Sequence, residues 1–157
     1  VDEPTKIYWD IRLSERFPTV EFRVADVCAT VDEAVMLAGL CRAIAQTAYD
    51  DHLAEKDYPK VRPSVLRAAM WQAARYGLGG ELIDFDLNQS LPAAQTVKHL
   101  LDRIRPALEK AGDWDEVSGL VETTLTQGNA AQRQRKAYEQ TQSCESVVDF
   151  LIEETAR

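Results

Sequence analysis

Two short segments near the start of the chain alternate between apolar and polar residues, and they constrain the fold more than any other feature. The apolar members are Ile7, Trp9 and Ile11 in residues 6–13, and Val20, Phe22 and Val24 in residues 19–26. Alternation with a period of two predicts β-strands that bury one face. The connection, residues 14–18, is short, so we expect the strands to pair antiparallel. Because two strands do not form a stable sheet alone, we expect them to complete a sheet of a larger protein.

Beyond residue 30 the sequence is helical in pattern. Thr30 and Glu33 fit a capping box that begins a helix to about Glu55, and Pro63 and Gly77 fit the start and the stop of a second helix. An irregular stretch or small hairpin at 81–91 precedes a helix at about 92–110. Asp113 and Glu116 fit the cap of the next helix, which Gly128 and Asn129 break, and a polar helix at 130–140 is followed by a last one that Ser143 caps. These patterns predict an α+β fold, with an antiparallel strand pair in residues 1–30 and a mainly α-helical subdomain in residues 31–157.

The apolar faces of the helices define an expected core. The helix at 30–55 is apolar on most of its sides, so we expect it to be deeply buried. In the later helices the apolar residues recur every three or four positions, which is typical of a face packed against a core. The core positions predicted in this way are Val97, Leu100, Leu101, Ile104, Leu108, Val117, Leu120, Val121, Leu125, Val147, Val148, Leu151 and Ile152.

The composition narrows the classes of function. Of the 157 residues, 45% are hydrophobic and 28% charged, which is the balance of a soluble globular domain. Acidic residues outnumber basic ones by 26 to 18, and the net charge of −8 argues against a nucleic-acid partner. No apolar run reaches the roughly 18 residues of a membrane span, and no signal peptide is visible, so we expect no membrane partner. Three scattered cysteines, Cys28, Cys41 and Cys144, suit a reducing compartment and predict a cytoplasmic location.

The polar face of the two strands carries four charged residues that project to one side if the strands pair, namely Asp10, Arg12, Glu21 and Arg23. One interpretation is a solvated face with cross-strand ion pairs. The other is a site in which a carboxylate holds Mg²⁺ beside arginines that hold phosphates. Rigid strands suit such a site, because metal and phosphate must be placed accurately. The residues alone leave both interpretations open.

Several segments resemble the carboxylate–amine ligases of the glutamate–cysteine ligase type 2 family. Residues 8–12 (YWDIR) followed by 19–26 (TVEFRVAD) resemble the closing strand pair of these enzymes. Residues 71–78 (WQAARYGL) resemble the family's Trp-x-Ala-x-Arg-Tyr-Gly segment, and residues 132–135 (QRQR) resemble a basic stretch near its C-terminus. The similarity covers nearly the whole chain, in the same order.

The resemblance implies a glutamine synthetase-like sheet completed by the strand pair, with this chain as the C-terminal part of one catalytic domain. Family members activate a carboxylate with ATP as an acyl phosphate and couple it to an amine. The implied substrates are small amino acids, a glutamate-like acid and a cysteine-like amine. Carried over by residue, Glu21 would bind Mg²⁺, while Arg23 and Arg12 would be the catalytic, ATP-binding contacts to the γ-phosphate or acyl phosphate. The other metal ligands would come from an N-terminal portion of the same enzyme.

One face of the second helix carries four residues spaced three or four apart, and it has two interpretations: Ser64, Arg67, Trp71 and Arg75. Either Arg75 binds ATP in the active site, or an arginine of this face stacks on Trp71 for packing. Arg133 and Arg135 also have two interpretations, contact with a partner chain or a solvated helix.

The two histidines lack companions that would suit metal ligation. His52 and His99 lie on polar helix faces, so we expect both to be exposed.

A rival function from a different class is a non-catalytic helical interaction module that docks on a partner through its strand pair. Further acidic strand motifs encoded upstream would favour the ligase. Assembly into a homo-oligomer is an open alternative under either function.

Overall fold

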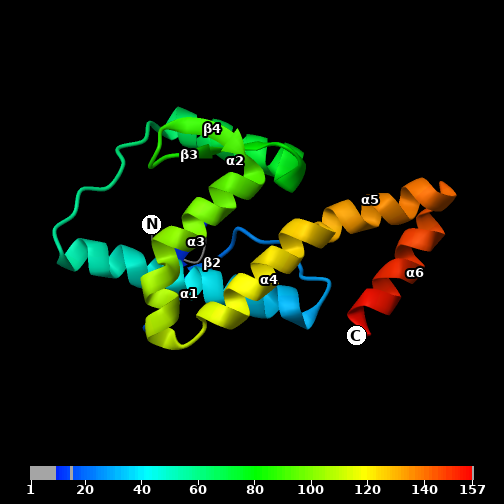
Figure 1. The fold of residues 1–157 in the computed structure, drawn as a ribbon, viewed down its shortest axis with the longest axis horizontal. Helices are drawn as coiled ribbons and strands as arrows, with labels where there is room; N and C mark the ends of the chain where they lie inside the picture. Colours follow the sequence, from blue (N-terminus) through cyan, green and yellow to red (C-terminus); the bar gives the residue numbers. More distant parts are fainter. Residues whose placement is uncertain (1–9, 15, 157) are drawn as a thin grey trace.

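The computed structural model describes residues 10–14 and 16–156 (Figure 1). The elements in chain order are β1 (Ile11–Leu13), β2 (Val20–Phe22), α1 (Val31–Leu53), α2 (Pro63–Tyr76), the short 3-10 helix η2 (Gly77–Gly79), β3 (Glu81–Asp84), β4 (Gln89–Pro92), α3 (Ala93–Ala111), α4 (Trp114–Gln127), α5 (Ala130–Thr141) and α6 (Cys144–Thr155). The predicted α+β class, mainly helical, is confirmed, with two small antiparallel strand pairs among the described residues.

The core lies between α1, α3 and α4, which cross one another in the centre of the molecule (Figure 1). Its largest fully buried side chains are those of Ile104, Leu108 and Val117. Gly39 allows α4 to approach α1 closely, because a Cβ at that position would lie 2.5 Å from Cγ2 of Val117. The core positions predicted in α3 and α4 are confirmed, either as buried residues or as residues packed against the core.

The helix boundaries follow the capping residues that the sequence predicted. Thr30 accepts a hydrogen bond from the Glu33 amide at 3.2 Å, so α1 begins as expected. The reciprocal half of the predicted capping box is wrong, because the Glu33 carboxylate accepts from the Ala29 amide and not from that of Thr30. Pro63 begins α2, and Gly77, with φ of 53°, ends it in a conformation that favours glycine. Ser143 caps α6 through its side chain, as predicted.

Two helix starts differ from the prediction. The expected cap of α4 by the Asp113 side chain is wrong, because that carboxylate forms an ion pair with Arg42 of α1 instead. The start of α5 was expected only as a break, but Asn129 and Gln132 form a reciprocal capping box there.

The hairpin β3–β4 is confirmed, and it carries α2 on one side and leads into α3 on the other. Its register pairs Glu81 with Pro92 and Asp84 with Gln89. The Gln72 side chain of α2 donates to the Glu81 carbonyl at 3.0 Å, which fixes α2 against the hairpin.

The strand pair β1–β2 is antiparallel as predicted but shorter than expected. Its register pairs Ile11 with Phe22, Arg12 with Glu21, and Leu13 with Val20. The predicted strand residues 6–9 lie outside the described residues. The apolar side of the pair is open to solvent, with Leu13 78% and Ile11 49% exposed.

The predicted burial of two helices is wrong in part. In α1 the buried residues are Met36, Gly39 and Ala43, while Val31 and Val35 are exposed. In α6 the expected core residues Val148 and Ile152 are also exposed. The physical reason is that α6 packs mainly on α5, and these two helices extend from the body as a hairpin (Figure 1).

Within the described ranges, no helix combines the length and the apolar character that a membrane crossing needs.

Candidate functional site

The charged side of β1–β2 brings together three of the residues that the sequence selected. Arg12 and Glu21 lie directly opposite each other in the register. The Nε of Arg12 donates to Oε2 of Glu21 at 2.5 Å, and the Nε of Arg23 lies 3.5 Å from Oε1 of the same carboxylate. The carboxylate therefore stands between two guanidinium groups, and we call these residues the Arg12–Glu21–Arg23 cluster.

The electrostatics of this cluster favour an ionised carboxylate. The hydrogen bond from Arg12 lowers the pKa of Glu21, and the positive charges of Arg12 and Arg23 lower it further, while partial burial opposes them. Glu21 is therefore charged at neutral pH, as a metal ligand must be.

The donor set of the cluster fits a shared magnesium–phosphate group. Mg²⁺ is commonly held by one or two carboxylates together with substrate phosphates and water, and Glu21 supplies one carboxylate. Arg12 and Arg23 supply planar forks that match phosphate oxygens. Within the part of the chain that the structure describes, no group of three potential metal ligands is present. A metal at Glu21 would therefore need ligands from the nucleotide and from outside these residues.

Arg75 lies on α2, a different element from the cluster, and is exposed. Trp71, one turn earlier, contacts Tyr76 edge-on, with ring centroids 6.0 Å apart. Among the described residues the cation–π contact is that of Arg105 over Trp114, at 4.4 Å. The structure therefore shows a different partner for Trp71 than an arginine and leaves the predicted role of Arg75 in ATP binding as a prediction.

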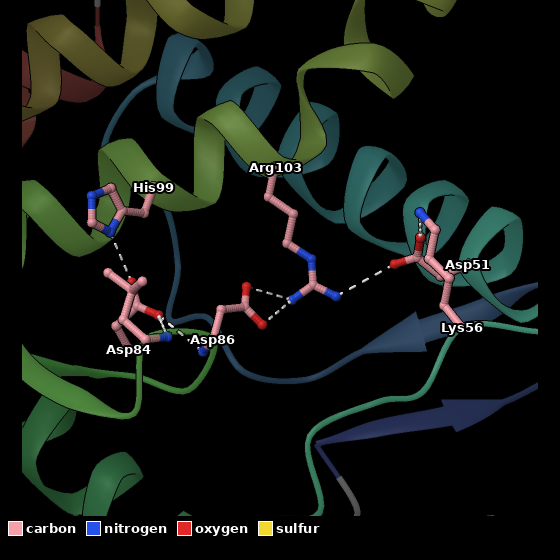
Figure 2. Close-up of polar contacts among 7 residues, drawn as sticks. Asp51, Lys56, Asp84, Asp86, His99 and Arg103 are labelled. Carbon is pink, nitrogen blue, oxygen red and sulfur yellow. Dashed lines mark hydrogen bonds and ion pairs between the residues drawn. The ribbon is translucent and has the colours of Figure 1, made fainter.

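A second charged cluster, which the sequence did not indicate, joins α1, α3 and the β3–β4 turn (Figure 2). Arg103 donates to both carboxylate oxygens of Asp86, at 2.8 and 2.9 Å, and lies 3.5 Å from Asp51. Lys56 approaches the other oxygen of Asp51 at 2.7 Å. These ion pairs join the β3–β4 turn to the C-terminal end of α1 and to the middle of α3.

His99 contributes to the same region. It is exposed, as predicted, but its Nδ1 lies 2.9 Å from Oδ2 of Asp84, whose side chain is 7% exposed. The backbone amide of Leu87 lowers the pKa of Asp84, and the hydrogen bond with His99 and the amide of Asp86 lower it further. A cleft of about 430 Å³ lies beside this pair. The signal missed in the sequence was an aspartate at the end of the first hairpin strand, β3, which lies beside the helix that carries His99.

Arg133 forms a third cluster. Its side chain is 17% exposed and pairs with Glu33 of α1 and Glu154 of α6, so the expectation of a solvated helix face is wrong for this residue. Arg135 is exposed, as that expectation required.

The sequence matches one known family along most of its length. The profile of the family described as glutamate-cysteine ligase family 2 matches residues 1–150. A protein of Frankia alni is 44% identical over 95% of this chain, one of Mycolicibacterium smegmatis is 42% identical over 95%, and one of Frankia casuarinae is 37% identical over 99%. Each of the three is named "Putative glutamate--cysteine ligase 2" with a further number.

These relatives are longer than the chain. The matched region spans 39% of the Frankia alni protein, 41% of the Mycolicibacterium smegmatis protein and 18% of the Frankia casuarinae protein.

Proposed function

Because this chain belongs to the glutamate–cysteine ligase family 2, we propose that it is the C-terminal part of an ATP-dependent ligase that joins a glutamate-like carboxylate to a cysteine-like amine. The observation that carries the proposal is the Arg12–Glu21–Arg23 cluster, one carboxylate between two arginines on paired strands. An N-terminal portion of the same enzyme would complete a glutamine synthetase-like sheet over the apolar side of β1–β2. The three free cysteines agree with a reducing, cytoplasmic location, which belongs to the same proposal.

The proposed reaction has two steps. First, a carboxylate oxygen of the acid attacks the γ-phosphorus of ATP, the bond to the β–γ bridging oxygen breaks, and ADP leaves. Second, the amine nitrogen attacks the acyl carbon, inorganic phosphate leaves with the bonding electron pair, and the nitrogen loses a proton to solvent. The first step brings two anions together, the carboxylate and the triphosphate, so positioning and charge neutralisation are the main tasks of the protein in that step.

The residues of the cluster divide these tasks. Arg23 would bind the γ-phosphate through its guanidinium group during the transfer from ATP to the carboxylate. Arg12 would make the second contact to the phosphate or acyl phosphate. Glu21 would hold Mg²⁺, which supplies positive charge against the phosphate oxygens when bound. Arg75 would contact the nucleotide from α2. The remaining metal ligands and most of the substrate pocket would come from the N-terminal portion.

The test measures phosphate release by the full-length protein that contains this chain, with ATP, Mg²⁺, glutamate and a panel of amines. We expect release that depends on both the acid and an amine, with the amide product identified by mass spectrometry. Glu21→Gln should reduce turnover by orders of magnitude while the melting temperature stays the same, because the shape is kept and the charge is lost. Glu81→Gln, a glutamate of the other strand pair, is the matched control and should leave turnover unchanged.

Two results would contradict the proposal: phosphate release that no amine stimulates, or a Mg²⁺ dependence that Glu21→Gln leaves unaltered. The exposed apolar side of β1–β2 favours the second candidate function, a non-catalytic module that docks on a partner. That candidate predicts tight binding of a partner without amine-dependent phosphate release, so the same assay separates the two functions.

A further inference from the structure

We propose that Arg133 is a positioning residue for the strand pair β1–β2, and that it acts through the first turn of α1. The inference rests on the proposed function, because it concerns where the Arg12–Glu21–Arg23 cluster is held. It starts from the ion pairs of Arg133 with Glu33 and Glu154, which we call the Arg133 cluster.

Arg133 joins three separate parts of the fold. Its Nη2 donates to Oε1 of Glu33 in α1 at 2.9 Å, and its Nε donates to Oε2 of Glu154 in α6 at 3.1 Å. Its Nη1 donates to the carbonyl of Gly128, between α4 and α5, at 2.8 Å. The Glu33 and Glu154 side chains are 14% and 11% exposed, so the cluster is largely shielded from water and holds a defined geometry.

Glu33, which Arg133 holds in place, also binds the segment that leads from β2 into α1. Its second oxygen, Oε2, accepts a hydrogen bond from the Ala29 amide at 2.9 Å. Its own backbone amide donates to Oγ1 of Thr30, which caps the helix. One glutamate therefore connects Arg133 to the last residue before the helix cap.

The segment fixed at Ala29 is the direct continuation of the proposed active-site strand. β2 ends at Phe22, and the Arg23 amide then donates to the Asp10 carbonyl at 2.7 Å, so Arg23 still belongs to the strand pair. The extensive contacts of β1 and β2 are with each other, and Val24 and Val27 in the connection are exposed. Among the described residues, the hydrogen bond at Ala29 ties the end of this connection to the first turn of α1.

Only arginine can make this set of contacts from one position. Its fork donates in three directions, to Glu33, Glu154 and Gly128, whereas a lysine has a single nitrogen at the end of a flexible chain. Arg133→Lys should keep the positive charge between the two carboxylates, and with it the fold, but lose part of the bridge.

The experiment compares wild type, Arg133→Lys and Arg135→Lys in the full-length protein. Hydrogen exchange is followed by mass spectrometry in peptides that cover residues 24–33, and kcat and the KM for ATP are measured by phosphate release. We expect Arg133→Lys to speed exchange in residues 24–33 and to lower kcat by about 10²-fold, with little change in KM, because a displaced group costs most in the transition state. Arg135→Lys, an exposed arginine of the same helix, should change neither.

Two outcomes would overturn the proposal. One is unchanged exchange in residues 24–33 of Arg133→Lys. The other is faster exchange throughout the protein in parallel with a lower melting temperature, which would show a stabilising role only. The exchange measurement needs no turnover, so a wild type without ligase activity would refute the proposed function while the exchange data still decide whether Arg133 fixes the segment.

Discussion

Apolar side chains are buried in the helical body but exposed in the strand pair. In the body, formed by α1, α3 and α4, Ile104 and Leu108 are 1% and 0% exposed. In the strand pair, Leu13 is 78% exposed and Ile11 is 49% exposed, although these residues lie on the apolar face. The body closes its own core, whereas the strand pair presents an apolar face on one side and the Arg12–Glu21–Arg23 cluster on the other. We infer that stability resides in the body and the proposed chemistry in the strand pair.

The largest expected effect is on the body. Ile104→Ala should lower the free energy of unfolding by about 2–5 kcal/mol, because it removes buried methylene groups and leaves a cavity. Leu13→Ala in the isolated chain is the matched control and should change it by no more than about 0.5 kcal/mol, since that side chain already contacts water. Urea denaturation of both variants checks this. Equal losses of unfolding free energy in the two variants would contradict this difference between the two regions.

The next effect is on turnover alone. Under the proposed function, Arg23→Lys in the full-length protein should leave the melting temperature nearly unchanged and lower kcat by about 10²–10³-fold, because lysine keeps the charge but loses the fork that would hold the phosphate. The KM for ATP should change far less than kcat. Steady-state kinetics at saturating Mg²⁺ test this. Near-wild-type turnover would show that Arg23 has no role in the reaction and is only a charged residue on a solvated sheet face.

A smaller effect distinguishes the isolated chain from the complete enzyme. If an N-terminal portion covers the apolar face, Leu13→Ser should destabilise the full-length protein by about 1.5–3 kcal/mol, the value for burying a leucine side chain. The same substitution in residues 1–157 alone should have almost no effect. Chemical denaturation of both lengths measures the difference, and a loss that is equally small in both would show that the face stays uncovered.

The smallest effect is a pH dependence where the β3–β4 hairpin meets α3, a helix of the body. Because the pKa of Asp84 is lowered in the folded state, its ionised form contributes stability that is present above its ordinary value of 3.8 and lost as the pH falls through the folded value. In Asp84→Asn the unfolding free energy should therefore change less with pH on the acid side, which we call the acid limb. Asp102→Asn, an exposed aspartate of α3, should leave that limb as it is. If Asp84→Asn leaves the unfolding free energy at acid pH with the same pH dependence as wild type, Asp84 does not contribute to that dependence.

Local signals predicted most of the elements, because their causes lie within a few residues. Thr30 with Glu33, Pro63 and Gly77 each act on the nearest turn of a helix, so they place the start of α1 and both ends of α2 correctly. The period of two, together with a short connection, placed Arg12, Glu21 and Arg23 on one side of the strand pair.

The failures concern partners that are distant in the sequence. An apolar stripe says which side of a helix is apolar but not what covers it, so Val148 and Ile152 were predicted to be buried and are exposed. The bridge from Arg133 to Glu33 and the pair of His99 with Asp84 depend on tertiary packing, which no spacing within one helix encodes.

The distance along the chain between Glu33 and Arg133 also bears on the order of folding during synthesis. The two residues are 100 positions apart. A ribosome adds about 5–20 residues per second, so roughly 5–20 s pass between the appearance of the glutamate and that of the arginine. The strand pair is thus made before α5 and α6, and its connection to the helical body is completed only when these two helices have been synthesised. During this interval we expect its exposed strand edges to be most open to pairing with another chain.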